Sequence, residues 1–425
     1  MRPFTSTISF DAALKIALDA TVQITATETI PIGESDGRVV AVDIVSSLDV
    51  PPFDRSAMDG YAVRSQDCSA PSALLHVIGR VFTGEVFPGQ VGPGECVEIA
   101  TGAPMPNGAD AVVMVEDTRH ETAGLPSEAA QVRLRSAAKA GQNIGRRAAD
   151  IAKGAAVVSR GDVLTPSRVG AIAAVGVKDV EVFRKPTVAI VSTGNEVVAP
   201  GLPLPPGHIY DINRFTLEAV ARRHGGRPVA LASAGDSPDA SAGDSIEQLD
   251  RVLDAAVAYD LIVFSGGSSV GDRDLVCDVI GARGQILFHG IAVKPGKPTA
   301  FAKIPGVVSS ATPGEKRLPV LFLGMPGNPT SCLSNAYILL IPVLRKLAGR
   351  PAWEPRTVTV PLARRIASAN DRHQFYTVRL VNGHAEPAFK GSGDITSMAN
   401  ADGYIEIPAN TESVESGTSV RVTLF

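Results

Sequence analysis

The pattern of apolar and polar positions changes along the chain and predicts several domains. A helix is expected after Ser9, and residues 74–117 then form short apolar runs broken by Gly and Pro, which is typical of a small β domain. From Thr187 onwards, apolar runs of strand length alternate with helical patterns, which predicts a parallel α/β sheet. Residues 357–425 alternate in a turn-rich pattern without a convincing helix, so we expect a second small β domain there, such as a barrel.

One stretch of the α/β region, residues 260–274, has the form of an anion-binding turn. Its apolar run is typical of a buried parallel strand and breaks at Ser265-Gly266-Gly267, where two glycines can present backbone N–H groups to a ligand. Asp272 and Asp274 then begin a helical pattern. A strand, a glycine turn and a helix N-terminus together predict an anion site, although turn geometry alone also accounts for the glycines.

Charged residues follow several apolar runs of this region. In a parallel sheet such loops all emerge at the carboxyl ends of the strands, here called the carboxyl edge, so residues far apart in sequence converge. These residues are Glu196, Asp236, Asp274, Lys294 and Lys297. Lysines suit phosphate or oxyanion charge, and carboxylates suit Mg²⁺. The sequence therefore predicts a phosphorylated or oxyanionic small-molecule ligand with a metal ion.

Structural explanations remain open for several of these residues. Asp236 and Asp272 are equally well explained as helix N-caps, and Lys294 as a solvated charge at the rim of the site. Pro326 and Pro329 need only set turns. The seven histidines show no spacing typical of a metal site, and the chain has no GxSxG motif and no Walker P-loop.

Composition excludes some classes of protein. The net charge of −4 and the aromatic content of 5% disfavour a nucleic-acid partner. The four cysteines have no CxxC spacing, which favours reduced thiols and a cytoplasmic location over zinc or disulfides. We predict no signal peptide, because Asp11 interrupts the N-terminal apolar pattern, and no membrane span, because Pro342 breaks the longest apolar run.

Taken together, the motifs resemble those of the molybdopterin molybdenumtransferase family, which is also found as the C-terminal part of gephyrin. They follow the family's order from about residue 50 to residue 330, and a further match reaches residue 408. The matching motifs are PPFDRSAMDGYAVR (51–64), ATGAPMPNGADAVVMVE (100–116), RRAADI (146–151), STGNE (192–196), IYDINR (209–214), SGGSSVGDRD (265–274), VKPGKP (293–298), MPGNP (325–329) and GSGDITSMANADGYIEIP (391–408).

The resemblance implies a multidomain α/β plus β fold in an elongated homodimer. An extended linker domain would come from residues 1–48 and 147–184, with a small β domain, 49–146, inserted between them. Residues 185–350 would form a central molybdopterin-binding-like parallel α/β domain, and residues 351–425 a C-terminal β-barrel. Asp59 and Thr101 of one subunit would face the α/β site of the other.

The resemblance also implies a reaction, in which molybdenum from molybdate enters adenylylated molybdopterin with Mg²⁺-dependent release of AMP. The catalytic residues would be Asp59, Thr101, Glu196, Asp236 and Asp274, of which Glu196 and Asp274 would hold Mg²⁺. The substrate-binding residues would be Arg147, Asp150, Ser265, Gly266, Gly267, Ser269, Gly271, Lys294, Lys297, Pro326, Pro329, Arg372 and Ser397. Molybdopterin adenylyltransferases and apo-molybdoenzymes are the protein partners that this reaction implies.

The chain departs from the family pattern at two places. Ser268 stands where the family has an apolar residue, and Phe375 is followed by Thr377 where the family often has Arg, with Arg379 further on. The second departure concerns oxyanion contacts from the last domain. Two other functions remain as alternatives. A molybdopterin adenylyltransferase would share the α/β domain but lack the other domains, and a non-catalytic molybdopterin-binding scaffold would not need to keep the acids and lysines.

Overall fold

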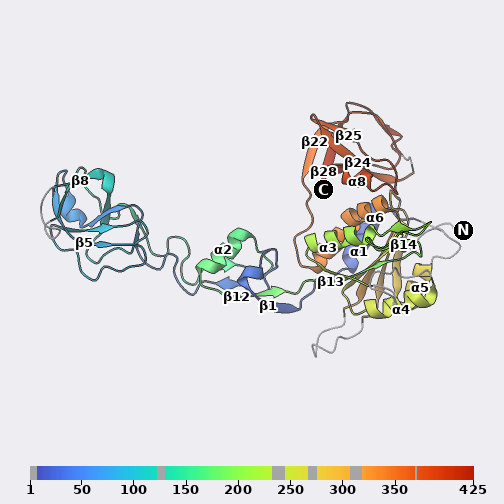
Figure 1. The fold of residues 1–425 in the computed structure, drawn as a ribbon, viewed down its shortest axis with the longest axis horizontal. Coiled ribbons are helices and arrows are strands. Elements are labelled where there is room, and N and C mark those ends of the chain that lie inside the picture. Colours follow the sequence, from blue (N-terminus) through green and yellow to red (C-terminus); the bar gives the residue numbers. More distant parts are fainter. Residues whose placement is uncertain (1–6, 122–129, 232–244, 267–274, 307–317, 369–370) are drawn as a thin grey trace. The chain divides into compact units, whose positions relative to one another are not determined.

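The computed structural model describes residues 7–121, 130–231, 245–266, 275–306, 318–368 and 371–425 (Figure 1). The chain divides into two compact units. Unit 1 comprises Met1–Glu28, Gly37–Val39 and Val182–Phe425, and unit 2 comprises Thr29–Asp36 and Val40–Glu181. The finer division into four domains stays a prediction. Among the described residues, no helix combines the length and the apolar character that crossing a membrane requires.

The centre of unit 1 is a six-stranded sheet in the order β16-β13-β17-β21-β20-β18. Its strands are β13 (Thr187–Ser192), β16 (Arg227–Ala230), β17 (Leu261–Ser265), β18 (Gln285–His289), β20 (Ala300–Ile304) and β21 (Val320–Met325). The sheet is mixed and not wholly parallel as expected, because β20 runs antiparallel to both of its neighbours. Since β18 therefore runs parallel to β21, the loop from β18 to β20 still emerges at the carboxyl edge.

Helices cover both faces of this sheet, as Figure 1 shows. They are α1 (Phe10–Ala20), α3 (Asn213–Arg223), α4 (Ile246–Ala256), α5 (Leu275–Arg283), α6 (Pro329–Asn335) and α7 (Ile341–Leu347), with a π-helical segment, Ala336–Leu340, joining the last two. Successive strand residues point to opposite faces. Val188 and Ile190 of β13 accordingly lie in the core with α1, α3, α6 and α7, and Ala189 and Val191 lie in the core with α4 and α5.

The C-terminal part of unit 1 contains a sheet in the order β19-β24-β26-β28-β22. A further strand, β25, pairs with the end of β24. Its elements are β19 (Val293–Lys294), β22 (Thr357–Pro361), β23 (Ile366–Ala367), β24 (His373–Val381), β25 (His384–Pro387), α8 (Thr396–Ala399), β26 (Gly403–Ile407), β27 (Ser413–Val414) and β28 (Ser419–Leu424). A bridge between Leu362 and Ala385 brings β25 back beside the end of β22, which agrees with the expected barrel. The short helix α8 was not predicted. Its four residues give too little periodicity to detect.

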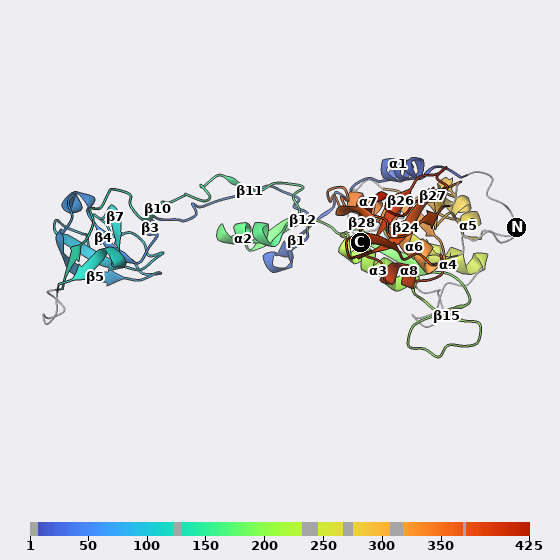
Figure 2. The same cartoon turned by 90° about the horizontal axis from the view of Figure 1, so that it is seen from above.

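Unit 2 contains a six-stranded sheet in the order β7-β4-β6-β5-β9-β8, part of which is labelled in Figure 2. Its strands are β4 (Gly60–Val63), β5 (Leu74–Val81), β6 (Glu95–Ile99), β7 (Ala111–Met114), β8 (Thr118–His120) and β9 (Gln131–Leu134). The remaining elements near or in unit 2 are β1 (Thr27–Pro31), β2 (Ile44–Val45), β3 (Arg55–Ser56), β10 (Ile144–Gly145), β11 (Ala156–Val158), α2 (Pro166–Ala174) and β12 (Asp179–Phe183). The β domain expected from the sequence is therefore present, and β8 and β9 add an antiparallel pair to it.

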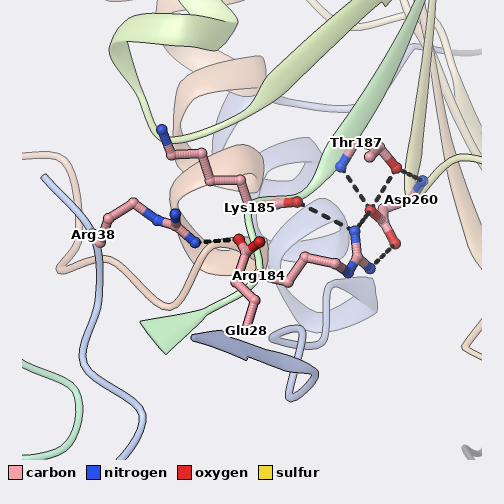
Figure 3. A network of polar contacts seen from close by, with 6 residues as sticks. All are labelled: Glu28, Arg38, Arg184, Lys185, Thr187 and Asp260. Carbon is pink, nitrogen blue, oxygen red and sulfur yellow. Dashed lines mark hydrogen bonds and ion pairs between the residues drawn. The ribbon is translucent and has the colours of Figure 1, made fainter. Parts of the chain in front are cut away.

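A network of polar contacts ties the amino ends of β13 and β17 together (Figure 3). The guanidinium of Arg184 donates to both carboxylate oxygens of Asp260, at 2.9 Å each. The backbone N–H and the hydroxyl of Thr187 donate to the same carboxylate at 2.6 and 2.7 Å. Beside this group, Arg38 pairs with Glu28. Asp260 thus joins two neighbouring strands at the edge opposite the carboxyl edge.

His224 is buried just after α3. Its ring packs edge-on against that of Trp353, with 4.7 Å between the centroids. Among the described residues, its Nδ1 has no hydrogen-bond partner. Burial, together with Arg345, Arg350 and Arg223, lowers the pKa of His224 from 6.5 to about 4. The folded protein therefore holds this imidazole neutral at pH values where an unfolded chain would protonate it.

We expect unit 1 to lose up to about 3 kcal/mol of stability as the pH falls from 6.5 to about 4. The contribution is fully present above the unfolded pKa, because neither state then binds the proton. His224→Phe should flatten this pH dependence, measured as the urea midpoint of the fluorescence of Trp353, the single tryptophan. The exposed His384 provides a control variant, His384→Phe. Equal acid sensitivity in wild type and His224→Phe would contradict this account.

Candidate active site

The strand order of the unit 1 sheet reverses at β13. The next strand of this sheet in sequence, β16, lies on one side of β13, and β17 lies on the other, so the carboxyl edge has a topological switch point between β13 and β17. Ligands of open α/β sheets bind at such a switch point. The loops that follow the strands meet there, since Thr193 donates its N–H to the Ser265 carbonyl at 3.0 Å and Gly266 donates to the Met325 carbonyl at 3.1 Å.

Gly266 is required by the close approach of these loops. Its φ of +96° is unfavourable for other residues, and a Cβ there would lie 2.8 Å from the hydroxyl oxygen of Thr193 and 2.9 Å from its carbonyl oxygen. The preceding Ser265 is buried, and its side chain hydrogen-bonds the Cys332 thiol. Burial raises the pKa of that thiol to about 12, so Cys332 is not a nucleophile at neutral pH. Five predicted site residues lie outside the described residues: Asp236, Gly267, Ser269, Gly271 and Asp274.

Glu196 lies in the loop that follows β13, at the switch point. Its side chain is exposed and folds over Gly194, whose Cβ would lie 2.7 Å from one carboxylate oxygen. The short strands β14 (Val197–Val198) and β15 (Ile209–Tyr210) pair directly after it, and the loop between them extends from the body of unit 1 in Figure 2. An accessible carboxylate at this edge has the oxygen ligands that Mg²⁺ takes.

The lysine loop, residues 293–298, lies at the same edge, and hydrogen bonds from Asn335 on α6 hold it in place. Asn335 donates from its amide to the Gly296 carbonyl at 2.9 Å and to the Thr299 hydroxyl at 2.5 Å. Thr299 in turn donates to the Gly296 carbonyl at 2.8 Å. Both Asn335 and Thr299 are fully buried, whereas Lys294 and Lys297 are half-buried. The backbone of the loop that carries the two lysines is therefore fixed.

The C-terminal domain brings Arg372 to the lysine loop. Val293 and Lys294, which form β19, pair in parallel with the start of β24, directly after Arg372. Arg372 donates from Nε to Asp371 at 3.1 Å. This hydrogen bond is the largest cause that lowers the pKa of Asp371, and Lys297 contributes to the same shift. Asp371, which sequence reasoning did not select, thus lies near both cations.

The loops that carry Pro326, Pro329 and Ser397 also meet. Pro326 is buried in the MPGNP turn, and Pro329 is the first residue of α6. The side chain of Asn328 donates to the hydroxyl of Ser392 at 3.1 Å. Ser397 is fully buried, and its hydroxyl accepts the N–H of Lys390 at 2.9 Å. Ser397 therefore shapes its own loop beside the start of α6.

In unit 2, Asp59 and Thr101 lie together. The N–H of Thr101 donates to the Asp59 carboxylate at 2.8 Å. This bond and a second one from the Thr101 side chain lower the pKa of Asp59. Both residues are exposed. An ionised carboxylate is thereby fixed in a set direction on the surface of the β domain.

Arg147 and Asp150 lie where the chain leaves the β domain. Arg147 donates from Nε to Asp49 at 2.6 Å, and its N–H donates to Asp54 at 2.8 Å. Asp54 also accepts from Arg146 at 2.6 Å. Asp49 and Asp54 were not predicted. The exposed Asp150 lies in the same turn. These bonds join the segment that enters the β domain to the segment that leaves it. Arg147 therefore has a structural role.

The described part of the chain holds no cluster of three or more His, Cys, Asp or Glu side chains suited to a metal ion. The chain is a multidomain α/β plus β protein with a glycine turn and three cations at the carboxyl edge of its central sheet.

Comparison with known families gives three matches that succeed one another along the chain. Residues 8–176 match the MoeA N-terminal region (domain I and II), residues 189–346 a probable molybdopterin binding domain, and residues 359–425 the MoeA C-terminal region (domain IV).

Named relatives match this chain over nearly its whole length. A molybdopterin molybdenumtransferase of Haemophilus influenzae is 33% identical over 410 residues, which cover 94% of each chain. Molybdopterin molybdenumtransferase 2 of Mycobacterium tuberculosis is 34% identical over 93% of this chain and 94% of its own. The crystal structure of a molybdopterin biosynthesis MoeA protein from Pyrococcus horikosii superposes with a TM-score of 0.80 at 36% identity and covers 99% of both chains. The chain belongs to the molybdopterin molybdenumtransferase family, which is a family of transferases.

Proposed function

We propose that this protein transfers molybdenum from molybdate into adenylylated molybdopterin, with Mg²⁺-dependent release of AMP, to give molybdenum cofactor. The observation that carries the proposal is the convergence of Lys294, Lys297 and Arg372 at the carboxyl edge of the sheet that also carries the glycine turn. Three cations on rigid backbone suit a ligand that combines phosphates with an oxyanion. Names of relatives over the whole chain length support the same reaction.

Each predicted site residue has a role in this proposal. Lys294, Lys297 and Arg372 bind molybdate and the phosphates, and the backbone of the turn that begins at Gly266 binds the pyrophosphate. Ser265, Gly267, Ser269 and Gly271 are proposed as further substrate-binding residues of the same anion site, and Pro326, Pro329 and Ser397 as residues that shape the loops beside it. Arg147 and Asp150 are proposed as substrate-binding residues of unit 2.

Mg²⁺ is proposed as the metal ion. The exposed carboxylate of Glu196 at the carboxyl edge fits an oxygen-coordinated cation, and Asp274 is proposed as a further ligand. When bound, Mg²⁺ supplies positive charge to the phosphates whose bond breaks. Asp236 is proposed as a further catalytic acid near them.

We further propose a cytoplasmic homodimer in which Asp59 and Thr101 complete the site of the other subunit. The fixed, ionised and exposed Asp59 supports a role in binding or catalysis. Asp59→Asn and Lys297→Met alone should each retain no more than about 1% of wild-type activity. Co-refolded or co-expressed subunits should regain about a quarter of wild-type activity, because mixed dimers then contain one intact site. No recovery in mixed dimers of proven composition would contradict the shared site.

Lys297→Met should lower the rate of AMP release by about 100-fold, because a cation aimed at developing negative charge is lost. The assay supplies adenylylated molybdopterin, molybdate and Mg²⁺, and measures AMP together with reconstitution of an apo-molybdoenzyme. Lys303→Met is the matched control. Lys303 lies on β20 towards the opposite edge of the sheet, and its replacement should leave the rate unchanged.

The same assay separates the competing function. ATP-dependent adenylylation of molybdopterin without molybdate-dependent AMP release would identify an adenylyltransferase and overturn the proposal. The matches outside the molybdopterin-binding domain, residues 8–176 and 359–425, favour the molybdenum-inserting function. A molybdopterin adenylyltransferase as supplier of the substrate and apo-molybdoenzymes as receivers of the product are the proposed protein partners.

A further inference from the structure

Two buried polar atoms at the switch point have no partner among the described residues: the hydroxyl oxygen of Ser192 and the amide oxygen Oδ1 of Asn213. Both residues are more than nine-tenths buried, with 8% and 7% of their surfaces exposed. Buried polar groups in folded proteins are nearly always hydrogen-bonded, so each exception needs an explanation. Ser192 is the last residue of β13 and Asn213 the first of α3, and neither has a role in the proposed reaction so far.

The orientation of the Asn213 amide is set by its other end. Its Nδ2 donates to the Gly327 carbonyl at 2.7 Å, which leaves Oδ1 as an acceptor. Gly327 is exposed in the MPGNP turn, and a Cβ on it would lie 3.4 Å from the Cα of Gly266. Asn213 therefore lies directly behind the glycine turn at the switch point.

Ser192 lies on the other side of the same turn. It pairs in register with Ser265 on β17, one residue before Gly266. The next residue, Thr193, uses both its N–H and its hydroxyl to bind the Ser265 carbonyl, at 3.0 and 3.3 Å. Thr193 is thus occupied, whereas the hydroxyl of Ser192 remains available as a donor or an acceptor.

We propose that Asn213 Oδ1, assisted by the Ser192 hydroxyl, accepts hydrogen bonds from the exocyclic amino group on the fused pyrimidine heterocycle of a bound ligand. This inference rests on the proposed function, whose substrate carries such an amino group on both its pterin and its adenine. The lysines and Arg372 at the carboxyl edge suit anionic groups, whereas an amide oxygen repels an anion and attracts an N–H donor. Asn213 thereby recognises the heterocycle, and the cations bind the phosphates.

Two matched ligand pairs test the proposal by calorimetric titration without molybdate. Pterin is compared with pteridin-4-one, which lacks the 2-amino group, and AMP is compared with purine ribonucleoside monophosphate, which lacks the 6-amino group. Wild type should prefer the amino compound of one pair by about tenfold, a typical effect of one buried hydrogen bond. The pair that shows the preference identifies the ring. No preference in either pair would overturn the proposal and leave a bound water as the partner of Oδ1.

Two variants separate recognition from support of the turn. Asn213→Leu removes the acceptor and should abolish the preference. Asn213→Asp keeps an acceptor but loses the donor to Gly327, so it should weaken both ligands of a pair and retain the preference. A merely structural Asn213 would lower the affinity of both ligands equally in both variants, which would overturn the proposal. Because no turnover is measured, failure of molybdenum insertion would leave this result intact.

Discussion

Gly296→Ala is expected to lower the rate of AMP release by at least about 100-fold while leaving a folded protein. Gly296 has a φ of +108°, which costs a non-glycine residue about 1–3 kcal/mol. A Cβ at this position would also lie 2.4 Å from Oδ1 and 2.5 Å from Nδ2 of Asn335. Asn335 is fully buried on α6 and cannot move aside without breaking its hydrogen bonds to the loop. The loop backbone must shift, and Lys294 and Lys297 shift with it.

The effect of this displacement is expected chiefly in the rate constant and in the KM for molybdate, because a cation misplaced by about 1 Å loses much of its effect on a transition state. Gly201→Ala is the matched control. Gly201 has a similar φ of +96° in the same unit, but no atom lies within 4 Å of its Cβ position. It should cost stability and leave the rate unchanged. Equal activity of Gly296→Ala and Gly201→Ala would mean that Asn335 does not set the path of the lysine loop.

The double variant Gly296→Ala with Asn335→Ala tests the same contact from the other side. Truncation of Asn335 makes room for the new Cβ, so the two substitutions should be less harmful together than the sum of their separate effects. Asn335→Ala alone should destabilise the protein by about 1–3 kcal/mol, since the Gly296 carbonyl and the Thr299 hydroxyl lose a donor. Strict additivity in thermal unfolding would contradict the contact.

Elements with local signals could be predicted from the sequence. The strand Thr187–Ser192 follows Pro186, the helix Asn213–Arg223 ends before Gly225 and Gly226, and both have the bounds that the pattern indicates. The antiparallel direction of β20 could not be predicted, because an apolar strand reads alike in either direction. Strand direction depends on how the connecting loop folds.

The candidate site was predicted in its chemistry and only partly in its construction. The lysines and the glycine turn stand out by residue type, and the family motifs add Arg372. Asn335 and Asp371 could not be found, because Gly296, which Asn335 binds, and Lys297, which lies near Asp371, are far away in sequence. Asn335 is 39 residues from Gly296. The oxyanion contact proposed for the last domain is Arg372, which lies directly before the strand that pairs with the lysine loop. The roles of Asp236 and Asp274 stay predictions.

Asp260→Ala should produce the largest loss of stability, about 3 kcal/mol for unit 1, with little change in the activity of the folded protein. The carboxylate accepts four hydrogen bonds, two from Arg184 and two from Thr187, so truncation removes all four, including the charge-assisted pair with the partly buried guanidinium (Figure 3). Activity should survive, because Asp260 lies at the amino ends of β13 and β17, away from the carboxyl edge.

The pH dependence of Asp260 gives this prediction a second readout. Burial would raise the pKa of Asp260, but the hydrogen bonds from Arg184 and Thr187 outweigh burial and lower it below 3.8. The wild-type carboxylate therefore contributes stability above the unfolded pKa, and this contribution is lost as the pH falls through the lower, folded value. Denaturant titrations at neutral and acidic pH should show that the stability of wild type approaches that of Asp260→Ala in acid.

Asp254→Ala, which removes an exposed partner of Arg283, is the control and should change stability by less than about 1 kcal/mol. If Asp260→Ala were as stable as wild type at neutral pH, the strand ends would be held by the apolar core alone.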